Sequence, residues 1–459
     1  MSIDSMLFIT CLLPALVLLH WLIPGGKARN AILLGAGLVF CAFGSLSGLL
    51  ILLAVAAANY FLGRGILAGK WPKLFCALAV ALDLGVLVFF KYLDFLLSEL
   101  LGLPPMELGI AAPLGISFYT FKAVSYTVDL YRDRSRGTRH FGELLLYFSF
   151  FPQFTAGPIS RFGEFQSQLT ERARDPERIA RGIRRFAVGL GKKLILAGAL
   201  GKLADGVFGV EPGLLDWRLG WLGAIGYMLQ LYFDFSGYSD MAIGLGNAFG
   251  FTTPENFDYP YSATSITDFW RRWHISLSSW FKDYLYIPLG GNRKGKLRTG
   301  LNKLLVFLFC GIWHGANWTF VLWGLWHGLF SALESARWIR PGKNFLSRLY
   351  ALLVVCLGFV MFRAASVAEG AAMIGAMFTG FRSPEGATEL LRSLLTGEVL
   401  FTLVISAVAA QPLIPKLRQT ALGRRVLEPA SWGLCLVLFV LCLAKLASGG
   451  FSPFIYAQF

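Results

Sequence analysis

The sequence between Arg29 and Arg64 is NAILLGAGLVFCAFGSLSGLLILLAVAAANYFLG, 34 residues without one charged side chain. A transmembrane α-helix needs about 20 mostly apolar residues. The small, polar break Gly44–Gly48 (GSLSG) divides the stretch into two halves. The sequence therefore predicts two short membrane-spanning helices joined by a tight turn. The basic residues that flank the pair predict that its outer ends lie on the cytoplasmic side, because cytoplasmic loops carry an excess of Lys and Arg.

Similar apolar runs recur along the whole chain, with basic clusters between them. Of the 459 residues, 56% are hydrophobic and only 15% are charged, whereas about 25% of a soluble protein is charged. This composition excludes a disordered chain and an ordinary soluble enzyme. The net charge of +15 is assigned to cytoplasmic loops rather than to nucleic-acid binding. The predicted fold class is an all-α polytopic membrane protein with roughly ten to twelve spans.

Cysteine and histidine spacing argues against a metal centre. His314 and His327 are thirteen residues apart, about 20 Å along one helix. The cysteines lie singly in apolar stretches and form no CxxC pair, so neither a disulfide framework nor a zinc site is expected. These cysteines are Cys11, Cys41, Cys76, Cys310, Cys356, Cys435 and Cys442.

Two segments depart from the pattern of simple spans. Residues 141–158 (FGELLLYFSFFPQFTAGP) are apolar but short and contain two prolines, which favours a re-entrant segment buried in protein. Residues 172–193 mix arginines with apolar positions and are expected to lie along the inner membrane surface. No internal repeat is evident, which weakens the case for an inverted-repeat transporter.

Polar side chains gather in residues 230–240 (QLYFDFSGYSD), which include Asp234, Tyr238 and Asp240. Acids within a membrane are costly and usually face a polar interior. They can equally form a structural hydrogen-bond network that ties spans together. Both interpretations stay open at this point.

Residues 264–284 (TSITDFWRRWHISLSSWFKDY) place aromatic residues at helical spacing. Ser265 followed by Asp268 predicts a capped helix start, and the pattern predicts an interfacial helix with an aromatic face. His274 falls on or near the packed face of this helix. A buried structural histidine and a catalytic one both fit that position.

Residues 310–327 (CGIWHGANWTFVLWGLWH) place His314 in an apolar span between Gly311, Gly315 and Ala316. Small neighbours allow a second backbone or a narrow ligand to approach closely. Asn317, one turn on, could orient the imidazole. An ionisable residue within the membrane suggests function, and histidine is the usual general base near neutral pH.

The loop 290–296 (GGNRKGK) matches the GxxxxGK pattern, but Leu297 replaces the Ser or Thr that a phosphate-binding loop requires. It is interpreted as a basic cytoplasmic loop able to meet a phosphate-bearing ligand. The chain contains no GxSxG serine motif.

Four motifs together resemble the membrane-bound O-acyltransferase (MBOAT) family, and within it the alginate O-acetyltransferase branch of bacterial cell-envelope acetylases. They are FTAGPI at 154–159, YFDFSGYSDMAIG at 232–244, FWRRWHISLSSWFKDYLYIPLGGNR at 269–293 and IWHGANWTFVLWGLWHG at 312–328. The similarity covers most of the chain and is densest from 150 to 330.

The resemblance implies an MBOAT-type ring of tilted helices around a central tunnel, in the bacterial inner membrane. It implies a single membrane domain over residues 1–459, with N-terminal spans in 1–140, a catalytic core in 141–335 and C-terminal spans in 336–459. An acyl thioester, expected to be acetyl-CoA, would enter from the cytoplasm, and the acceptor would lie outside. No bound cofactor, metal or nucleic acid is implied; membrane lipids surround the chain.

The resemblance also implies roles for individual residues. His314 maps to the catalytic histidine of the family, and His274 to a second histidine that lines the same chamber. The residues expected to shape or brace the chamber are Trp313, Asn317, Trp318, Asp234, Tyr238, Asp240, Trp270 and Ser278. The basic residues expected to steer the polyanionic CoA are Arg271, Arg272, Lys282, Arg293, Lys294 and Lys296.

The segment Phe454–Phe459 (FIYAQF) resembles a tail in this branch whose tyrosine is proposed to carry the acyl group, so Tyr456 is a candidate relay; a terminal aromatic anchor is the alternative.

The chain lacks a serine nucleophile motif, so an extracytoplasmic SGNH-type transferase is expected to complete O-acetylation of an alginate-like exopolysaccharide. The alternatives are D-alanyl or other acyl transfer to another envelope polymer, or a proton-coupled transporter or flippase.

Overall fold

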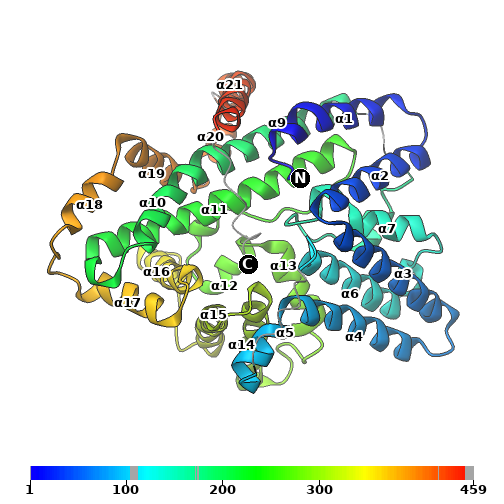
Figure 1. The fold of residues 1–459 in the computed structure, drawn as a ribbon, viewed down its shortest axis with the longest axis horizontal. Coiled ribbons are helices and arrows are strands. Elements are labelled where there is room, and N and C mark those ends of the chain that lie inside the picture. The colour runs from blue at the N-terminus through cyan, green and yellow to red at the C-terminus, as the bar shows by residue number, and fades with distance from the viewer. Residues whose placement is uncertain (1, 104–111, 171, 173–174, 422, 450–459) are drawn as a thin grey trace. The chain divides into compact units, whose positions relative to one another are not determined.

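The computed structural model describes residues 2–103, 112–170, 172, 175–421 and 423–449 (Figure 1). Every regular element in these ranges is a helix or a helical turn, and no strand occurs in them. The predicted all-α class is confirmed. Tyr456 and the rest of the 454–459 tail lie outside the described residues.

Five helices of the described ranges are long and apolar enough to cross a membrane, and the count is six if one bent pair forms a single span. The prediction from residues 30–63 is confirmed: α2 (Gly26–Gly44) and α3 (Leu46–Ala68) are separated only by Ser45. The others are α4 (Pro72–Lys91), α16 (Phe345–Arg363), and α21 (Glu428–Ala447) with the turn before it; the bent pair is α18 (Ala387–Leu394) and α19 (Gly397–Ala409), at 69°. The remaining apolar segments are shorter, broken or less apolar, so fewer spans pass this test than the ten to twelve expected. The chain is a multi-pass membrane protein.

The chain divides into two compact units, formed by residues 1–186 with 239–255 and by residues 187–238 with 256–459. The helices α9 (Pro176–Gly191) and α11 (Trp217–Ala248) contribute residues to both. The three subregions and the ring with its tunnel, both implied by the resemblance, stay predictions.

In the first unit, α3, α4 and α6 (Ile116–Arg132) pack together around a buried polar contact. Asn59 donates to a carboxylate oxygen of Asp83 over 2.7 Å and accepts from the hydroxyl of Thr127 over 2.9 Å. The predicted break in 141–158 is present, because α7 (Phe141–Ser149) is followed only by the short turn Phe151–Gln153. The unit also contains α1 (Leu13–Leu22), the short α5 (Leu93–Phe95) and α8 (Phe162–Gln166).

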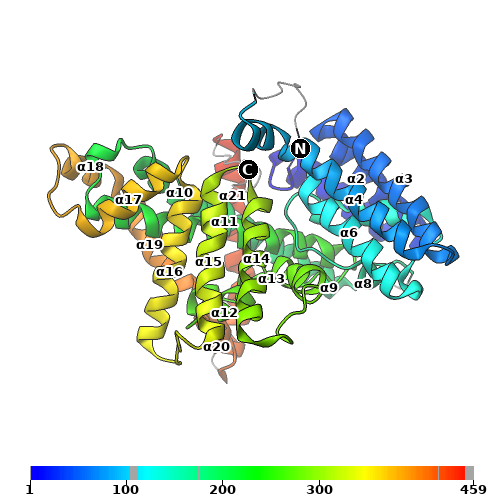
Figure 2. The same ribbon diagram turned by 90° about the horizontal axis from the view of Figure 1, so that it is seen from below.

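In the second unit, α15 (Trp318–Ala336) packs against both α14 (Gly295–His314) and α16 (Figure 2). A Cβ added to Gly311 would lie 2.3 Å from the carbonyl oxygen of Phe320, and one added to Gly324 would lie 2.3 Å from that of Phe307. The expected close approach of a second backbone beside His314 is therefore confirmed. The unit also contains α10 (Gly198–Phe208), α17 (Val367–Thr379) and α20 (Leu413–Arg418).

The single interfacial helix expected over 264–284 is wrong. The segment forms α12 (Ile266–Arg272), α13 (Ile275–Phe281) and the π-helical turn η8 (Lys282–Tyr286). The break falls at His274, whose φ of 45° and ψ of 54° are left-handed. The predicted cap is present, since Ser265 accepts a hydrogen bond from the Asp268 backbone over 2.9 Å. Glu334 of α15 adds a second cap by accepting from the backbone nitrogens of α12's first two residues.

Candidate functional site

His314 is the last residue of α14 and is buried. Its imidazole is enclosed by aromatic rings from three helices. The ring centroids of Trp313, Trp323 and Phe362 lie 4.8, 4.9 and 5.2 Å from that of the imidazole. The end of the helix therefore holds His314 in an aromatic cage.

Asn317 forms the turn after His314 and caps α15. Its side-chain oxygen accepts from the Thr319 backbone over 3.0 Å, and its nitrogen donates to the carbonyl of Ala365 over 3.1 Å. The amide thus fixes the start of α15 and its link to the residues after α16. The suggestion that it orients the His314 imidazole does not agree with these contacts. Trp318, the next residue, is 44% exposed.

His274 lies at the break between α12 and α13 and is buried. Its Nδ1 lies 3.1 Å from the side-chain oxygen of Asn256. Phe235 of α11 approaches the imidazole edge-on, with centroids 4.6 Å apart. Its Nε2 has no hydrogen-bond partner among the residues that the structure describes.

The same tryptophan contacts both candidate histidines. Trp313 lies 4.8 Å from His314 and 6.5 Å from His274, measured between ring centroids. The structure therefore brings His314, His274 and Trp313 together within one unit. Catalysis by either histidine stays a prediction.

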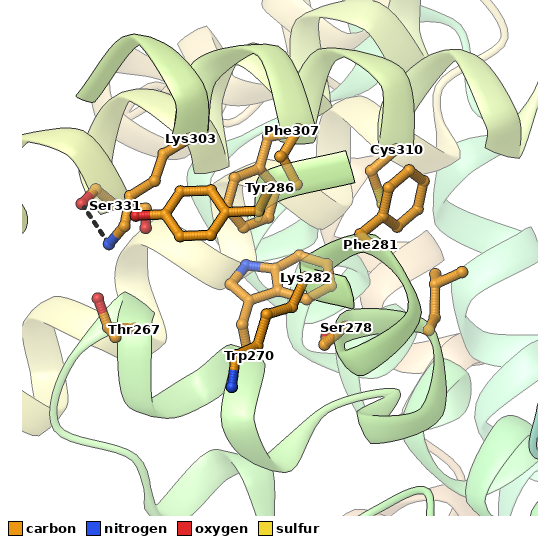
Figure 3. A pocket seen from close by; sticks show the side chains of 12 residues that line it. Thr267, Trp270, Ser278, Phe281, Lys282, Tyr286, Lys303, Phe307, Cys310 and Ser331 are labelled. Atoms are coloured by element: carbon orange, nitrogen blue, oxygen red, sulfur yellow. Dashed lines mark hydrogen bonds between the residues drawn. The ribbon is translucent and has the colours of Figure 1, made fainter. Parts of the chain in front are cut away.

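A cavity of about 700 Å³, including its open mouth, is lined by residues of α12, α13, η8, α14 and α15 (Figure 3), and neither histidine nor Trp313 is among them. Trp270 and Ser278, both expected in the chamber, line it together with Lys282, which was expected to steer CoA. Figure 3 also shows Lys303, which donates to the carbonyl of Ser331 over 3.2 Å. Cys310 lines the cavity as well and lies one helical turn before His314 on α14. The cavity thus runs along α14 from Lys303 to within one turn of the candidate base.

The two acids of residues 230–240 form ion pairs. Asp234 lies 2.6 Å from the ammonium of Lys193, and both side chains are buried. Asp240, in the other unit, accepts from Nε of Arg185 over 2.9 Å. These contacts favour the structural network over a role in binding. Tyr238, between them in sequence, is buried.

None of the other five basic residues expected to steer CoA is among the residues that line the cavity. Arg272 pairs with Asp268 and Asp258 at 3.1 and 3.2 Å. The remainder are exposed to solvent, namely Arg271, Arg293, Lys294 and Lys296.

Two residues of the site were missed by sequence reasoning. His327 is fully buried and its Nδ1 accepts from the indole nitrogen of Trp270 over 3.3 Å. Asn256 lies 18 residues before His274, and no local spacing connects the two. No group of three or more His, Cys, Asp or Glu side chains in the described ranges is arranged to hold a metal ion.

Comparison with known proteins gives a consistent result. The family model of the membrane-bound O-acyltransferases matches residues 116–368. The chain is 39% identical to a probable alginate O-acetylase, AlgI, of Pseudomonas putida over the full length of both proteins. It is 37% identical to a peptidoglycan O-acetyltransferase of Helicobacter pylori over 72% of this chain and 70% of that one. It is 31% identical to a teichoic acid D-alanyltransferase of Streptococcus thermophilus over 50% of this chain and 58% of that one.

Proposed function

The chain belongs to the membrane-bound O-acyltransferase family, and from that premise we propose that it takes acetyl from cytoplasmic acetyl-CoA for O-acetylation of an alginate-like exopolysaccharide. Its class is that of an O-acyltransferase. The polysaccharide acceptor is supported by the alginate O-acetylases, which match over their full length. The peptidoglycan and teichoic acid enzymes match over a smaller share of the chain. D-alanyl transfer is therefore the second choice.

The observation that carries this proposal is the cavity that follows α14. Lys282 and Lys303 supply positive charge on its lining, and the rest of the lining is mostly apolar. Positive charge suits the phosphates of CoA, and an apolar groove suits its thin pantetheine arm. On α14 the lining includes Lys303 and Cys310, and Cys310 lies one helical turn before His314, the residue that the thioester would need to reach.

The proposed reaction is a general-base acyl transfer. His314 takes the proton of an attacking hydroxyl, whose oxygen forms a bond to the thioester carbonyl carbon. The carbon–sulfur bond breaks, and the departing thiolate receives the proton from the imidazolium to give free CoA thiol. The aromatic cage around His314 excludes water, which limits hydrolysis of the thioester.

Two further parts of the proposal concern the route outward. Tyr456 would receive the acetyl group and present it outside the bacterial inner membrane. An extracytoplasmic SGNH-type transferase would then place it on the polysaccharide. The absence of a GxSxG motif from the sequence supports a separate final transferase.

The test uses purified protein in detergent with acetyl-CoA labelled on its acetyl group. We expect free thiol to be released by the wild type and by His140→Ala, which removes an exposed histidine, but not by His314→Ala. Acetyl label on the C-terminal peptide of the wild type, together with its absence in Tyr456→Phe, would support the relay. Release of thiol without labelling of that peptide would contradict the relay. If the wild type released no thiol even with its extracytoplasmic partner, the acyltransferase proposal would fail and a transporter would be favoured.

A further inference from the structure

The side-chain oxygen of Asn256 collects three hydrogen bonds. Its partners are the Ser276 backbone nitrogen at 3.2 Å, the Ser276 hydroxyl at 2.9 Å and Nδ1 of His274 at 3.1 Å. A backbone N–H can only donate. The atom that it meets must therefore be the amide oxygen, which fixes the orientation of the Asn256 amide without reference to histidine.

That orientation determines where His274 carries its proton. An amide oxygen can only accept, so Nδ1 must donate, and a neutral imidazole with its proton on Nδ1 has a lone pair on Nε2. We infer that Asn256 is a positioning residue that holds His274 in the Nδ1–H tautomer, so that Nε2 is presented as an acceptor to a hydroxyl-bearing substrate. The catalytic consequence rests on the proposed function; the tautomer does not.

The backbone around His274 is held by the same asparagine. The Asn256 carbonyl accepts from the Ile275 nitrogen over 3.0 Å, and the His274 carbonyl accepts from Ser278 over 3.0 Å. Asn256 therefore accepts hydrogen bonds from Ile275 and Ser276, the two residues that follow His274. Left-handed conformations are uncommon for residues other than glycine and persist where surrounding contacts determine them. The strained backbone and the directed imidazole thus have one common cause.

The surroundings of His274 keep the ring neutral. Phe235 of α11 and Trp313 of α14 face the imidazole, and neither titrates. Their titratable neighbours in sequence are Asp234, which forms an ion pair with Lys193, and His314. Burial lowers the pKa of His274 to about 3. The ring lies between α12 and α13, which are not among the candidate spans. A group that binds Nε2 must therefore supply its own hydrogen, as a sugar hydroxyl does.

The experiment compares Asn256→Asp, Asn256→Leu and Ser276→Ala in protein labelled with ¹⁵N-histidine. The chain has only five histidines, and His274→Gln identifies the signal of His274. We expect the wild type and Ser276→Ala to show a protonated Nδ1 and a bare Nε2. Asn256→Asp keeps the accepting oxygen and adds a negative charge, which should raise the pH at which His274 takes up a second proton by about 1–3 units. The absence of such a shift would contradict the contact between position 256 and the imidazole.

Turnover provides the second readout. Asn256→Leu should lower kcat for thiol release by about 100-fold with an unchanged KM for acetyl-CoA, and Asn256→Asp should restore most of kcat at pH 7.5. A wild-type His274 protonated on Nε2, or equal losses in Asn256→Asp and Asn256→Leu, would overturn the inference. If the wild type released no thiol, the proposed function would fail, yet the tautomer would still be decided by the spectrum.

Discussion

Lys282 combines two properties expected of a residue that receives a charged donor. It lines the cavity beside α14 and its side chain is exposed to solvent. An exposed charge pair contributes up to about 1 kcal/mol, so Lys282→Gln should raise KM for acetyl-CoA by about fivefold and leave kcat unchanged. Lys343→Gln makes the same charge change at an exposed position that does not line the cavity. Equal effects of the two substitutions on KM would contradict a donor contact at Lys282.

His327 has a different role from His314 and His274, because its Nδ1 accepts the indole hydrogen of Trp270. His327→Leu would leave that buried N–H without an acceptor, which costs about 1–3 kcal/mol. We expect a lower Tm in detergent, measured by thermal unfolding. His327→Asn places an amide oxygen near the position of Nδ1 and should restore part of the lost Tm. A Tm equal in both variants would indicate that the hydrogen bond contributes nothing.

The pairing of α14 with α15 depends on glycine at the contact. Gly311→Ala would push a methyl group against the carbonyl of Phe320, whereas a Cβ at Gly300 of the same helix would meet Ala332 at an ordinary 3.5 Å. Overpacking typically costs 1–3 kcal/mol, and Gly311 lies one turn before His314. Gly311→Ala should therefore lower both Tm and thiol release, while Gly300→Ala should preserve both. Full activity in Gly311→Ala would show that α14 can shift without disturbing the site.

The start of α11 is tied to the chain after α17 by Asp216. One carboxylate oxygen accepts from the backbone of Arg218 and Leu219, each over 3.0 Å, and the other accepts from the Arg218 guanidinium over 2.6 Å and from Ser383 over 2.9 Å. Burial raises the pKa of Asp216, and these hydrogen bonds lower it. The hydrogen bonds have the larger combined effect, so the net pKa lies below the ordinary value.

A lowered pKa means that the ionised carboxylate favours the folded state. This contribution is complete above the unfolded pKa of about 3.9 and is lost as the pH falls through the lower, folded pKa. The Tm of the wild type should therefore fall more steeply below pH 4 than that of Asp216→Asn, which keeps a capping oxygen without the charge. Thermal unfolding between pH 3 and 7 measures both slopes, and parallel slopes would exclude Asp216 as a source of acid sensitivity.

The elements differ in how far local sequence determines them. The pair α2 and α3 follows from a charge-free stretch of the right length, and α14 and α15 approach closely because glycines face the contact. The break at His274 is not local. The spacing of Trp270, Trp273 and Leu277 continues across it, and the contacts that maintain it come from Asn256, 18 residues away. His314, His274 and Trp313, chosen by motif, were brought together, whereas the contacts that support them were visible only in the structure.

At the scale of the whole molecule, the charge distribution and the cavity together predict the side of the membrane from which acetyl-CoA enters. The basic loop before α14 is expected on the cytoplasmic side. Along α14, Lys303 lies about 12 Å from the start of the helix and His314 about 28 Å, at 1.5 Å per residue. Donor entry at the Lys303 end therefore agrees with a cytoplasmic source of acetyl-CoA, and the candidate base lies at the far end of the helix.

The side on which that loop lies can be measured with Lys296→Cys, an exposed position, in a Cys11→Ser background. Of the seven native cysteines only Cys11 is exposed, so the background label should be low. An impermeant maleimide should modify Lys296→Cys in permeabilised cells and not in intact ones, with a cytoplasmic marker protein reporting permeability. Modification in intact cells would place the loop before α14 outside, where acetyl-CoA is absent. The proposed direction of acetyl transfer would then be wrong, even if thiol release in detergent still required His314.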